Sequence, residues 1–289
     1  INVIPHSFIP VSGINGDNIS ALSSNMPWYN DKTVIDILDE FENEPPQANK
    51  PFRMYVQDVY KFTKYGDKRR IVAGKVETGS IKTGEEITFY PSGKKSLVKS
   101  IESFNNSTQN EVPAGYNAGL TLDEQIYVTR GEVAIKASEK KPKVSTRFKA
   151  NLFWLGREPM LTGKEYLLKL GTSRVVARLE QVNRVIDASD LSTLENKAKI
   201  ERNDVAECII KLNKAIAYDL IDEIEITSRF VIVDNYEISG GGIITEYLDD
   251  KESRIREQVL LRNYKWEKSS ISKEERAENR KIFKNAQKL

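Results

Sequence analysis

The sequence predicts a mainly β protein, made of two consecutive β-barrels with short helical segments at both ends. From Ile71 to Glu102, runs of strand-forming residues alternate with turn triplets that lie too close together for helices. These triplets are Glu77-Thr78-Gly79, Lys82-Thr83-Gly84 and Pro91-Ser92-Gly93. A polar segment with the composition of a linker, Ser138–Lys143, separates six strand candidates from six more. Six short strands joined by turns are typical of a barrel.

The strand candidates fall into two groups that define the two barrels. The first barrel is expected within residues 51–138, with strands at Phe52–Tyr60, Arg70–Glu77, Glu86–Tyr90, Leu97–Phe104, Ala114–Leu122 and Glu132–Ala137. The second is expected within residues 144–247, with strands at Thr146–Trp154, Glu165–Leu170, Ser173–Asn183, Val205–Leu212, Arg229–Asp234 and Gly242–Tyr247. The glycines Gly240-Gly241-Gly242 are interpreted as a bulge at the entry to the last strand. Residues 248–289 are expected to form a helical tail, in which Ser272 and Glu275 make a capping-box pair.

The segment before the first barrel contains too few elements for a domain of its own. The apolar run Ser7–Val11 predicts a strand, and a glycine-bearing loop follows it. Apolar residues then recur at helical spacing behind Thr33, an N-cap with Asp36 three residues further on. The apolar stripe of such a helix needs a sheet or another helix to cover it. We therefore expect residues 1–47 to be the C-terminal remnant of a larger domain.

The composition and charge of the chain argue against two classes of binding partner, membranes and nucleic acids. The chain has 289 residues, of which 39% are hydrophobic and 30% are charged, as in ordinary soluble proteins with about two domains. No stretch approaches the roughly 20 apolar residues that a membrane helix needs, so no membrane partner is expected. Lys and Arg total 44 against 42 Asp and Glu, which argues against a large nucleic-acid surface. The basic clusters at Lys68-Arg69-Arg70 and around Lys140-Lys141 lack interleaved aromatic residues and are interpreted as solvated loops.

The few reactive side chains offer little chemistry. The single cysteine, Cys208, excludes a disulfide within the chain and any multi-thiolate metal site, and it fits a reducing cytoplasm. Its neighbours in the run Ala206–Leu212 indicate a packed, inert thiol in a strand. The only histidine, His6, has no partner visible in the sequence for general-base catalysis. No catalytic residue and no metal ligand are therefore predicted.

Several stretches, in this order and spacing, resemble the translational elongation-factor GTPases. They are PVSGINGDNI at 10–19, MPWY at 26–29, VQDVYKF at 56–62 and AGKVETGSIKTGEEI at 73–87. The resemblance implies two translation-factor-type barrels after the last strand of a GTP-binding domain, of which residues 1–47 would be the remnant. Ser12, Gly13 and Ile14 match the last guanine-contacting loop of that family. A strand-to-helix loop in which Asp17 or Asn18 caps a helix explains these residues without a ligand, and we favour that reading.

The second barrel narrows the resemblance to the GTPase (large) subunit of bacterial sulfate adenylyltransferase. ANLFWLGREPMLTGKEYLLKLGTSRVVARL at 150–179 and SRFVIVDNYEISGGGII at 228–244 carry it. In addition, NYKWEKSSISKEERAE at 263–278 resembles the junction with an adenylylsulfate kinase domain in fused forms. The intact enzyme would use GTP hydrolysis to drive the formation of adenylyl sulfate and diphosphate from ATP and sulfate on a small catalytic subunit. We expect the loop Leu155–Gly163, with Trp154, Arg157 and Glu158, to contact that subunit.

The nucleotide machinery of the family is missing from these 289 residues. No phosphate-binding G-x-x-x-x-G-K-[ST] motif occurs, and the nearest glycine spacing, Gly79 to Gly84, is followed by Glu85. The magnesium-binding aspartate motif and the Asn-Lys-x-Asp motif are also missing. GTP and Mg²⁺ are therefore expected in the intact protein and no cofactor in this chain. The alternatives are a set of tRNA-binding or ribosome-binding barrels like those of elongation factors, and a stand-alone interaction module.

Overall fold

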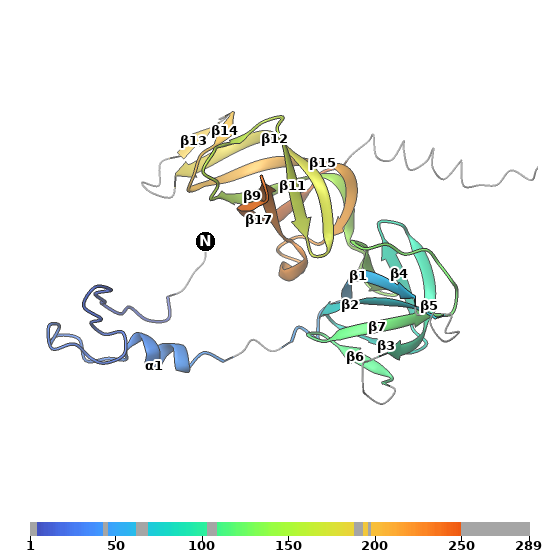
Figure 1. Ribbon diagram of the computed structural model, residues 1–289, viewed down its shortest axis with the longest axis horizontal. Helices are drawn as coiled ribbons and strands as arrows, with labels where there is room; N and C mark the ends of the chain where they lie inside the picture. The colour runs from blue at the N-terminus through green and yellow to red at the C-terminus, as the bar shows by residue number, and fades with distance from the viewer. Residues whose placement is uncertain are drawn as a thin grey trace, which may run out of the picture. The chain divides into compact units, whose positions relative to one another are not determined.

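The computed structural model describes residues 5–42, 46–61, 69–102, 109–187, 193–195 and 198–249. The chain divides into two compact units, Ile1–Pro46 and Gln47–Leu289, and each is described by itself (Figure 1). Nearly all of the predicted helical tail, including Ser272 and Glu275, lies outside the described residues. None of the helices in the described ranges has the length and apolar composition that a membrane span requires.

In the described residues of the first unit there is one helix, α1, at Val34–Asp39. The Thr33 hydroxyl accepts a hydrogen bond from the Asp36 amide at 3.2 Å, and the Asp36 carboxylate accepts one from the Thr33 amide at 2.9 Å. This reciprocal capping box confirms the predicted start of the helix. The donors of Thr33 also lower the pKa of the Asp36 carboxyl below its ordinary value.

The strand predicted at Ser7–Val11 is wrong. In this unit the described residues form no strand, and the backbone pairing near that segment is a single antiparallel bridge between Ser12 and Asp17. A strand forms only where a second strand satisfies its amides and carbonyls. Apolar composition without a partner strand in the described part of the unit is therefore not enough to make Ser7–Val11 a strand.

The first barrel is a closed sheet of six strands in the order β1-β2-β7-β5-β4-β8. Its strands are β1 (Arg53–Lys61), β2 (Arg70–Thr78), β4 (Glu86–Tyr90), β5 (Lys94–Glu102), β7 (Asn117–Leu122) and β8 (Val133–Lys136). A short two-stranded sheet of β3 (Ser80–Lys82) and β6 (Glu111–Pro113) accompanies it. Each of the six predicted strands has its counterpart among the six barrel strands.

The second barrel closes by one further strand pairing. The order β11-β16-β17-β9-β15-β12-β13 becomes a ring of six because β11 also pairs with β12. The strands are β9 (Lys143–Trp154), β11 (Glu165–Leu170), β12 (Ser173–Asp187), β13 (Thr193–Glu195), β15 (Asp204–Tyr218), β16 (Arg229–Asp234) and β17 (Glu237–Tyr247). A small sheet of β10 (Met160–Leu161) and β14 (Lys199–Ile200) and a 3-10 helix, η2 (Glu225–Thr227), complete it. The fold class predicted from the sequence is thus confirmed.

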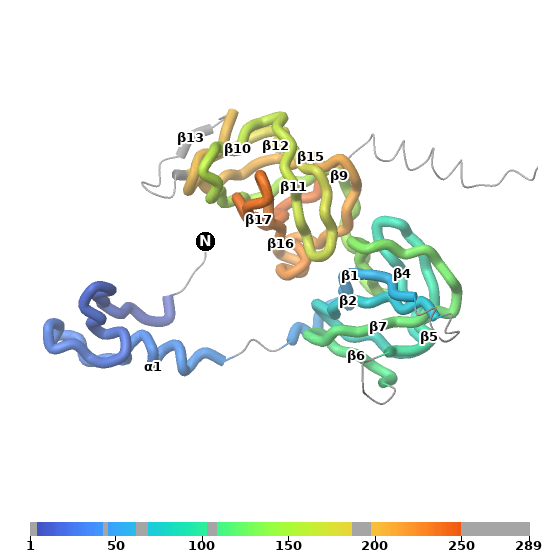
Figure 2. Tube along the Cα trace, viewed as in Figure 1, coloured from blue at the N-terminus to red at the C-terminus, as the bar shows by residue number. Residues whose placement is uncertain are grey.

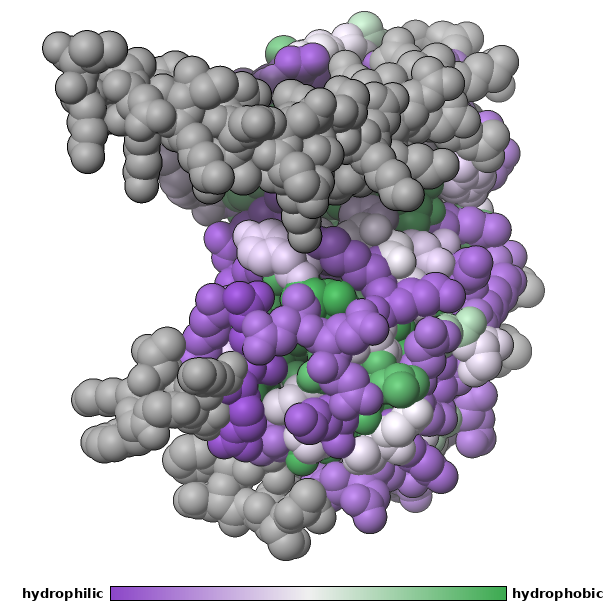
Figure 3. Space-filling model, turned by 90° about the vertical axis from the view of Figure 1, so that its right-hand side faces the viewer, coloured by the Kyte–Doolittle hydropathy of each residue, from purple (hydrophilic) through white to green (hydrophobic). Residues whose placement is uncertain are grey.

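Alternating residues of the strands fill the two barrel interiors. In β9 the buried residues Phe148, Ala150, Leu152 and Trp154 alternate with more exposed neighbours, as the two-residue period of a strand requires. Figure 2 follows the chain from the cyan and green strands of the first barrel into the yellow and orange strands of the second. On the face shown in Figure 3, hydrophilic residues cover most of the described surface and leave only small hydrophobic groups between them.

The glycine triplet of β17 makes room for two aromatic rings. A Cβ at Gly240 would lie 2.8 Å from the Trp154 ring, and one at Gly242 would lie 2.6 Å from the Phe230 ring. A register shift does occur in this strand, between Ile238 and Gly240 where they pair with β16. The missing side chains therefore let both rings lie directly against the strand.

Candidate functional site

The loop that matches the guanine-contacting position is a closed turn with an exposed tip. The Ser12 carbonyl accepts a hydrogen bond from the Gly16 amide at 2.8 Å, and the Ser12 hydroxyl accepts one from the Asn15 amide at 3.3 Å. The side chain of Ile14 is 99% exposed. A Cβ at Gly13 would meet nothing within 4 Å. The packing within the chain therefore does not require a glycine at position 13.

Asn18 holds this loop in place through its side-chain hydrogen bonds. The sequence did not reveal this role of Asn18. Asn18 is fully buried, its amide nitrogen donates to the Pro10 carbonyl at 2.8 Å, and its amide oxygen accepts from the Ser23 amide at 2.8 Å. The Asn18 carbonyl accepts from the Val34 amide at 3.1 Å, so it satisfies one of the unpaired donors at the start of α1. The expected side-chain cap at Asp17 or Asn18 is wrong, because Thr33 is the N-cap.

Many of the large apolar residues of the first unit are exposed within the described part of that unit. No residue of α1 is buried, and Leu38 is 54% exposed. Phe8, Trp28 and Phe41 are 81%, 71% and 66% exposed. Apolar stripes of this kind normally face a core, and the described residues of the unit do not cover this one. Trp28 is therefore not part of a buried core within the described residues of this unit.

The loop Leu155–Gly163 is held rigidly on the second barrel. The amides of Leu155 and Gly156 both donate to the Ser239 carbonyl at 2.8 Å. The indole nitrogen of Trp154 donates to the Glu158 carbonyl at 2.8 Å, and the Trp154 ring packs edge-on against another aromatic ring in the core. These hydrogen bonds attach the backbone of the loop to β17 and to the Trp154 side chain.

The three predicted contact residues do not share one environment. Trp154 is completely buried, so it positions the loop from the core and its side chain offers no contact surface. Arg157 and Glu158 are exposed on the loop. A buried aromatic residue with exposed charges above it gives a preorganised polar surface, which binds with little loss of conformational entropy.

A buried ion pair joins the two barrels. The Arg53 guanidinium on β1 meets the Asp219 carboxylate after β15 through two bonds, Nε to Oδ2 and Nη2 to Oδ1, each of 2.9 Å. Both side chains are no more than 2% exposed. Arg53 also donates to the carbonyls of Phe52 and Lys140, and the Thr227 hydroxyl donates to Asp219 at 2.7 Å. The pair is thus hydrogen-bonded on both sides, which a buried charge requires.

Tyr55 extends the same junction. Its ring is buried in the core cluster of the second barrel although it belongs to β1, and its hydroxyl donates to the Thr227 carbonyl at 3.4 Å. Burial, assisted by the nearby charge of Asp219, raises the pKa of the Tyr55 phenol above its ordinary value. Gly171 has φ +53 and lies so close that a Cβ there would be 2.6 Å from the Tyr55 ring. The Thr172 hydroxyl donates to the Val56 carbonyl at 2.7 Å. The two barrels therefore meet through a specific, packed surface.

Reactive groups are not brought together in the described ranges. There, no three residues among His, Cys, Asp and Glu form a group that could hold a metal ion. Cys208 is buried, and burial raises the pKa of its thiol to about 12, so the reactive thiolate is suppressed. His6 is exposed.

One family model matches the second barrel. Residues 147–245 match the family described as GTP-eEF1A C-terminal domain-like. Among solved structures, sup35 complexed with GDP matches with a TM-score of 0.64 and 20% identity, over 83% of this chain and 58% of that chain. At this identity the likeness shows the fold alone.

The sequence is also similar to those of several named proteins. The chain is 28% identical over 252 residues to sulfate adenylyltransferase subunit 1 of Shewanella woodyi, covering 86% of this chain and 52% of the relative. For the same subunit of Aeromonas salmonicida the identity is 28% over 285 residues, covering 95% and 59%. Elongation factor 1-alpha of Thermoplasma acidophilum is 32% identical over 234 residues, covering 79% and 54%. The chain spans slightly more than half the length of these relatives.

Proposed function

We propose that this chain is the barrel portion of the GTPase subunit of a sulfate adenylyltransferase. In the intact protein, GTP hydrolysis with Mg²⁺ on a preceding domain would drive the formation of adenylyl sulfate and diphosphate from ATP and sulfate, in cytoplasmic sulfate assimilation. The observation that carries the proposal is the likeness to sulfate adenylyltransferase subunit 1, which covers 86% and 95% of this chain in two relatives. The barrels would connect the nucleotide site to the small catalytic subunit.

The residues present fit only a small part of a GTP site. The turn at Ser12, Gly13 and Ile14 offers backbone groups and an open position at Gly13, which suits the edge of a guanine base. The 289-residue sequence contains no phosphate-binding loop, so this chain would supply no ligand for the phosphates or for Mg²⁺. The exposed apolar surface of Phe8, Trp28 and α1 is the surface that the rest of such a domain would cover.

The geometry suggests how the barrels could pass on a signal. Arg53, Asp219 and Tyr55 fix the first barrel to the second, so a movement of one barrel would carry the other with it. On the second barrel, Arg157 and Glu158 stand exposed on a loop that Trp154 holds in place. We assign the contact with the small catalytic subunit to this loop.

Co-purification with the small catalytic subunit tests the proposal. We expect the chain to retain that subunit, and the double variant Arg157→Ala, Glu158→Ala to retain it about tenfold less tightly, a loss of roughly 1.4 kcal/mol. The control is Lys211→Ala, an exposed change on β15 of the same barrel. If the unaltered chain retains no subunit, the proposed function is wrong. If the double variant is retained as tightly as the unaltered chain, the assignment of the contact to the loop is wrong.

Nucleotide titration provides a second test. The chain by itself should not hydrolyse GTP, and it should bind GTP no more tightly than ATP, because it has no guanine-specific phosphate-binding loop. Turnover by the purified chain would contradict the proposal. Sequencing the gene upstream should reveal G-x-x-x-x-G-K-[ST] within the preceding ~200 residues, the size of an ordinary domain.

The 32% identity to elongation factor 1-alpha favours one alternative function, a pair of barrels that binds tRNA or the ribosome. Such barrels would bind the phosphate backbone, and their affinity would fall steeply with salt. Salt-sensitive retention of tRNA, together with failure to retain the small catalytic subunit, would establish this alternative.

A further inference from the structure

A cavity of about 370 Å³ opens where the first barrel meets the second, away from the buried ion pair. Four segments form its walls: the hairpin between β4 and β5, the loop between β7 and β8, the start of β12 and the end of β15. Its volume lies within the range of small-molecule sites, roughly 300 to 1,000 Å³. Because both barrels contribute, a ligand there would bridge them.

Each wall of this cavity contributes one cation. Lys94 comes from the β4–β5 hairpin, Arg130 from the β7–β8 loop, Arg174 from β12 and Lys214 from β15. Within the described ranges, Arg130, Arg174 and Lys214 have no carboxylate partner. Other cations on the same barrels do, for example Arg147 with Glu180 at 2.8 Å. Three uncompensated charges converging on one cavity produce a positive field there.

The carboxylate in the described lining does not neutralise these cations. Glu132 is 5% exposed, and it accepts hydrogen bonds from the Thr129 amide at 2.9 Å, the Thr129 hydroxyl at 3.0 Å and the Ser92 hydroxyl. These bonds tie the β7–β8 loop to the hairpin beside it. Glu132 therefore shapes the wall, and the cations remain available for an anion.

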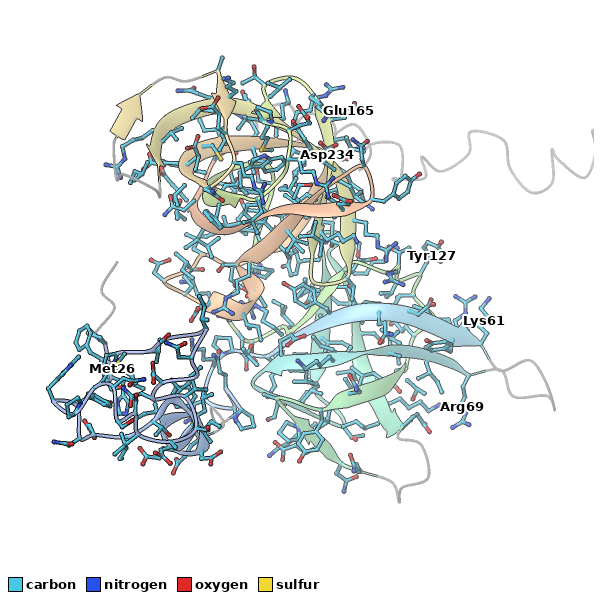
Figure 4. The ribbon with its side chains drawn as sticks, turned by 60° about the vertical axis from the view of Figure 1, so that its left-hand side comes forward. Met26, Lys61, Arg69, Tyr127, Glu165 and Asp234 are labelled. Carbon is cyan, nitrogen blue, oxygen red and sulfur yellow. The ribbon has the colours of Figure 1, made fainter. Side chains whose placement is uncertain are left out.

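An aromatic ring stands at the edge of the cavity. Tyr127 is 69% exposed, and the Lys94 ammonium lies 5.2 Å from the centroid of its ring. Lys94 also donates to the Tyr127 carbonyl, which fixes the two residues together. Figure 4 shows Tyr127 projecting outward from the molecule at the level where the two barrels meet. Cations beside an exposed aromatic ring are the combination that holds phosphates and stacks on a base.

We propose that this cavity binds the phosphate chain of a nucleoside polyphosphate. Arg130, Arg174 and Lys214 hold the phosphates, and Tyr127 stacks on the base. The cavity belongs to the second unit and is separate from the loop Ser12–Ile14, and the proposal stands independently of the sulfate adenylyltransferase assignment. Because the ligand would bind the folded chain and not the unfolded chain, it also stabilises the junction of the barrels.

The test is a calorimetric titration of the full 289-residue chain with inorganic tripolyphosphate, ATP and adenosine. Tripolyphosphate and ATP should bind, adenosine should not, and affinity should fall as salt screens the charges. Arg130→Ala, Arg174→Ala and Lys214→Ala should each weaken tripolyphosphate binding about tenfold, the effect of losing one charge-assisted hydrogen bond. Tyr127→Ala should weaken binding of ATP and leave that of tripolyphosphate unchanged.

The matched control is Lys95→Ala, because Lys95 follows Lys94 in β5, is exposed and does not line the cavity. Its binding should equal that of the unaltered chain. Arg130, Arg174 and Lys214 are all exposed, so the variants should fold, and far-UV circular dichroism checks this. Equal affinities for the control and the three cavity variants would overturn the proposal. Binding of long RNA without any affinity for tripolyphosphate would overturn it as well.

Discussion

At the scale of single residues, the pair of Arg53 and Asp219 is the most sensitive point of the second unit. Its members lie 166 positions apart in the sequence and are both nearly inaccessible to water. Removing one of them leaves the other as an uncompensated buried charge. The resulting loss in the free energy of unfolding is far larger than the contribution of the pair itself.

The first prediction concerns this pair. Arg53→Ala should lower the free energy of unfolding by about 3–5 kcal/mol, the usual effect of breaking a buried ion pair. The control is Arg178→Ala, since the pair of Arg178 and Glu165 is 57% and 58% exposed. It should change stability by no more than about 1 kcal/mol. Urea unfolding measures both, and similar losses would show that the buried pair is not a stability centre.

The second prediction uses the three consecutive glycines of β17. Gly240→Ala and Gly242→Ala should each lower the free energy of unfolding by about 1–3 kcal/mol, because the new methyl group would overlap buried atoms. A Cβ at Gly242 would lie 2.6 Å from the Asn151 carbonyl oxygen, a backbone atom that cannot turn aside. Gly241→Ala is the matched control, because its nearest atom lies at 3.7 Å. It should be neutral within about 0.5 kcal/mol by thermal unfolding, and three equal losses would refute the packing argument.

At the scale of elements, the twelve barrel strands follow from local pattern, while the small sheets do not. Strands such as β4 and β16 carry enough alternation and flanking turns to be found in the sequence. β10 and β14 have two residues each, too few to show a period, and they pair across about 40 positions. β15 continues to Tyr218, beyond the predicted Leu212, because its partner β9 is there to pair with it.

The third prediction concerns β15 and pH. Burial raises the pKa of the Cys208 thiol from 9.0 to about 12. The folded chain therefore keeps the thiol proton between pH 9 and 12, whereas the unfolded chain releases it. The contribution of this pKa shift to the free energy of unfolding is fully present below pH 9. Above pH 9 it falls by up to about 1.4 kcal/mol per pH unit.

Cys208→Ala should lower stability at neutral pH and flatten its decline above pH 9. Urea unfolding at pH 8 and pH 11 measures the difference. Burial also raises the pKa of Tyr218, so part of the decline should persist in the variant. An unchanged decline in the variant would exclude Cys208 as its source.

At the scale of the whole molecule, the junction of the barrels makes one folding unit from two sheets. Tyr55 of the first barrel belongs to the core cluster of the second, as do Val133 and Ile135 of β8. Together with the ion pair of Arg53 and Asp219, this shared core makes unfolding of one barrel expose the interior of the other.

The fourth prediction follows from this shared core. The two barrels should unfold in one transition, and Tyr55→Ala should lower the stability by about 3–5 kcal/mol and separate their transitions. With Trp28 and Trp266 replaced by Phe, the fluorescence of Trp154 reports the second barrel, and far-UV circular dichroism reports both. Tyr116→Ala, at a 63% exposed site in the first barrel, is the control and should leave one transition. Coincident curves for Tyr55→Ala would mean that other contacts carry the coupling.

The sequence by itself determined the barrel strands, the capped helix, the linker and the lack of a phosphate-binding loop. Each of these is recorded in a few neighbouring residues, through the two-residue period of strands or through turn and cap chemistry. Only the tertiary structure decided that Arg53 meets Asp219, that Trp154 is internal, and that cations of both barrels converge on one cavity. Such contacts depend on how strands close into barrels and how the barrels meet. Residues far apart in the chain carry no local sign of that geometry.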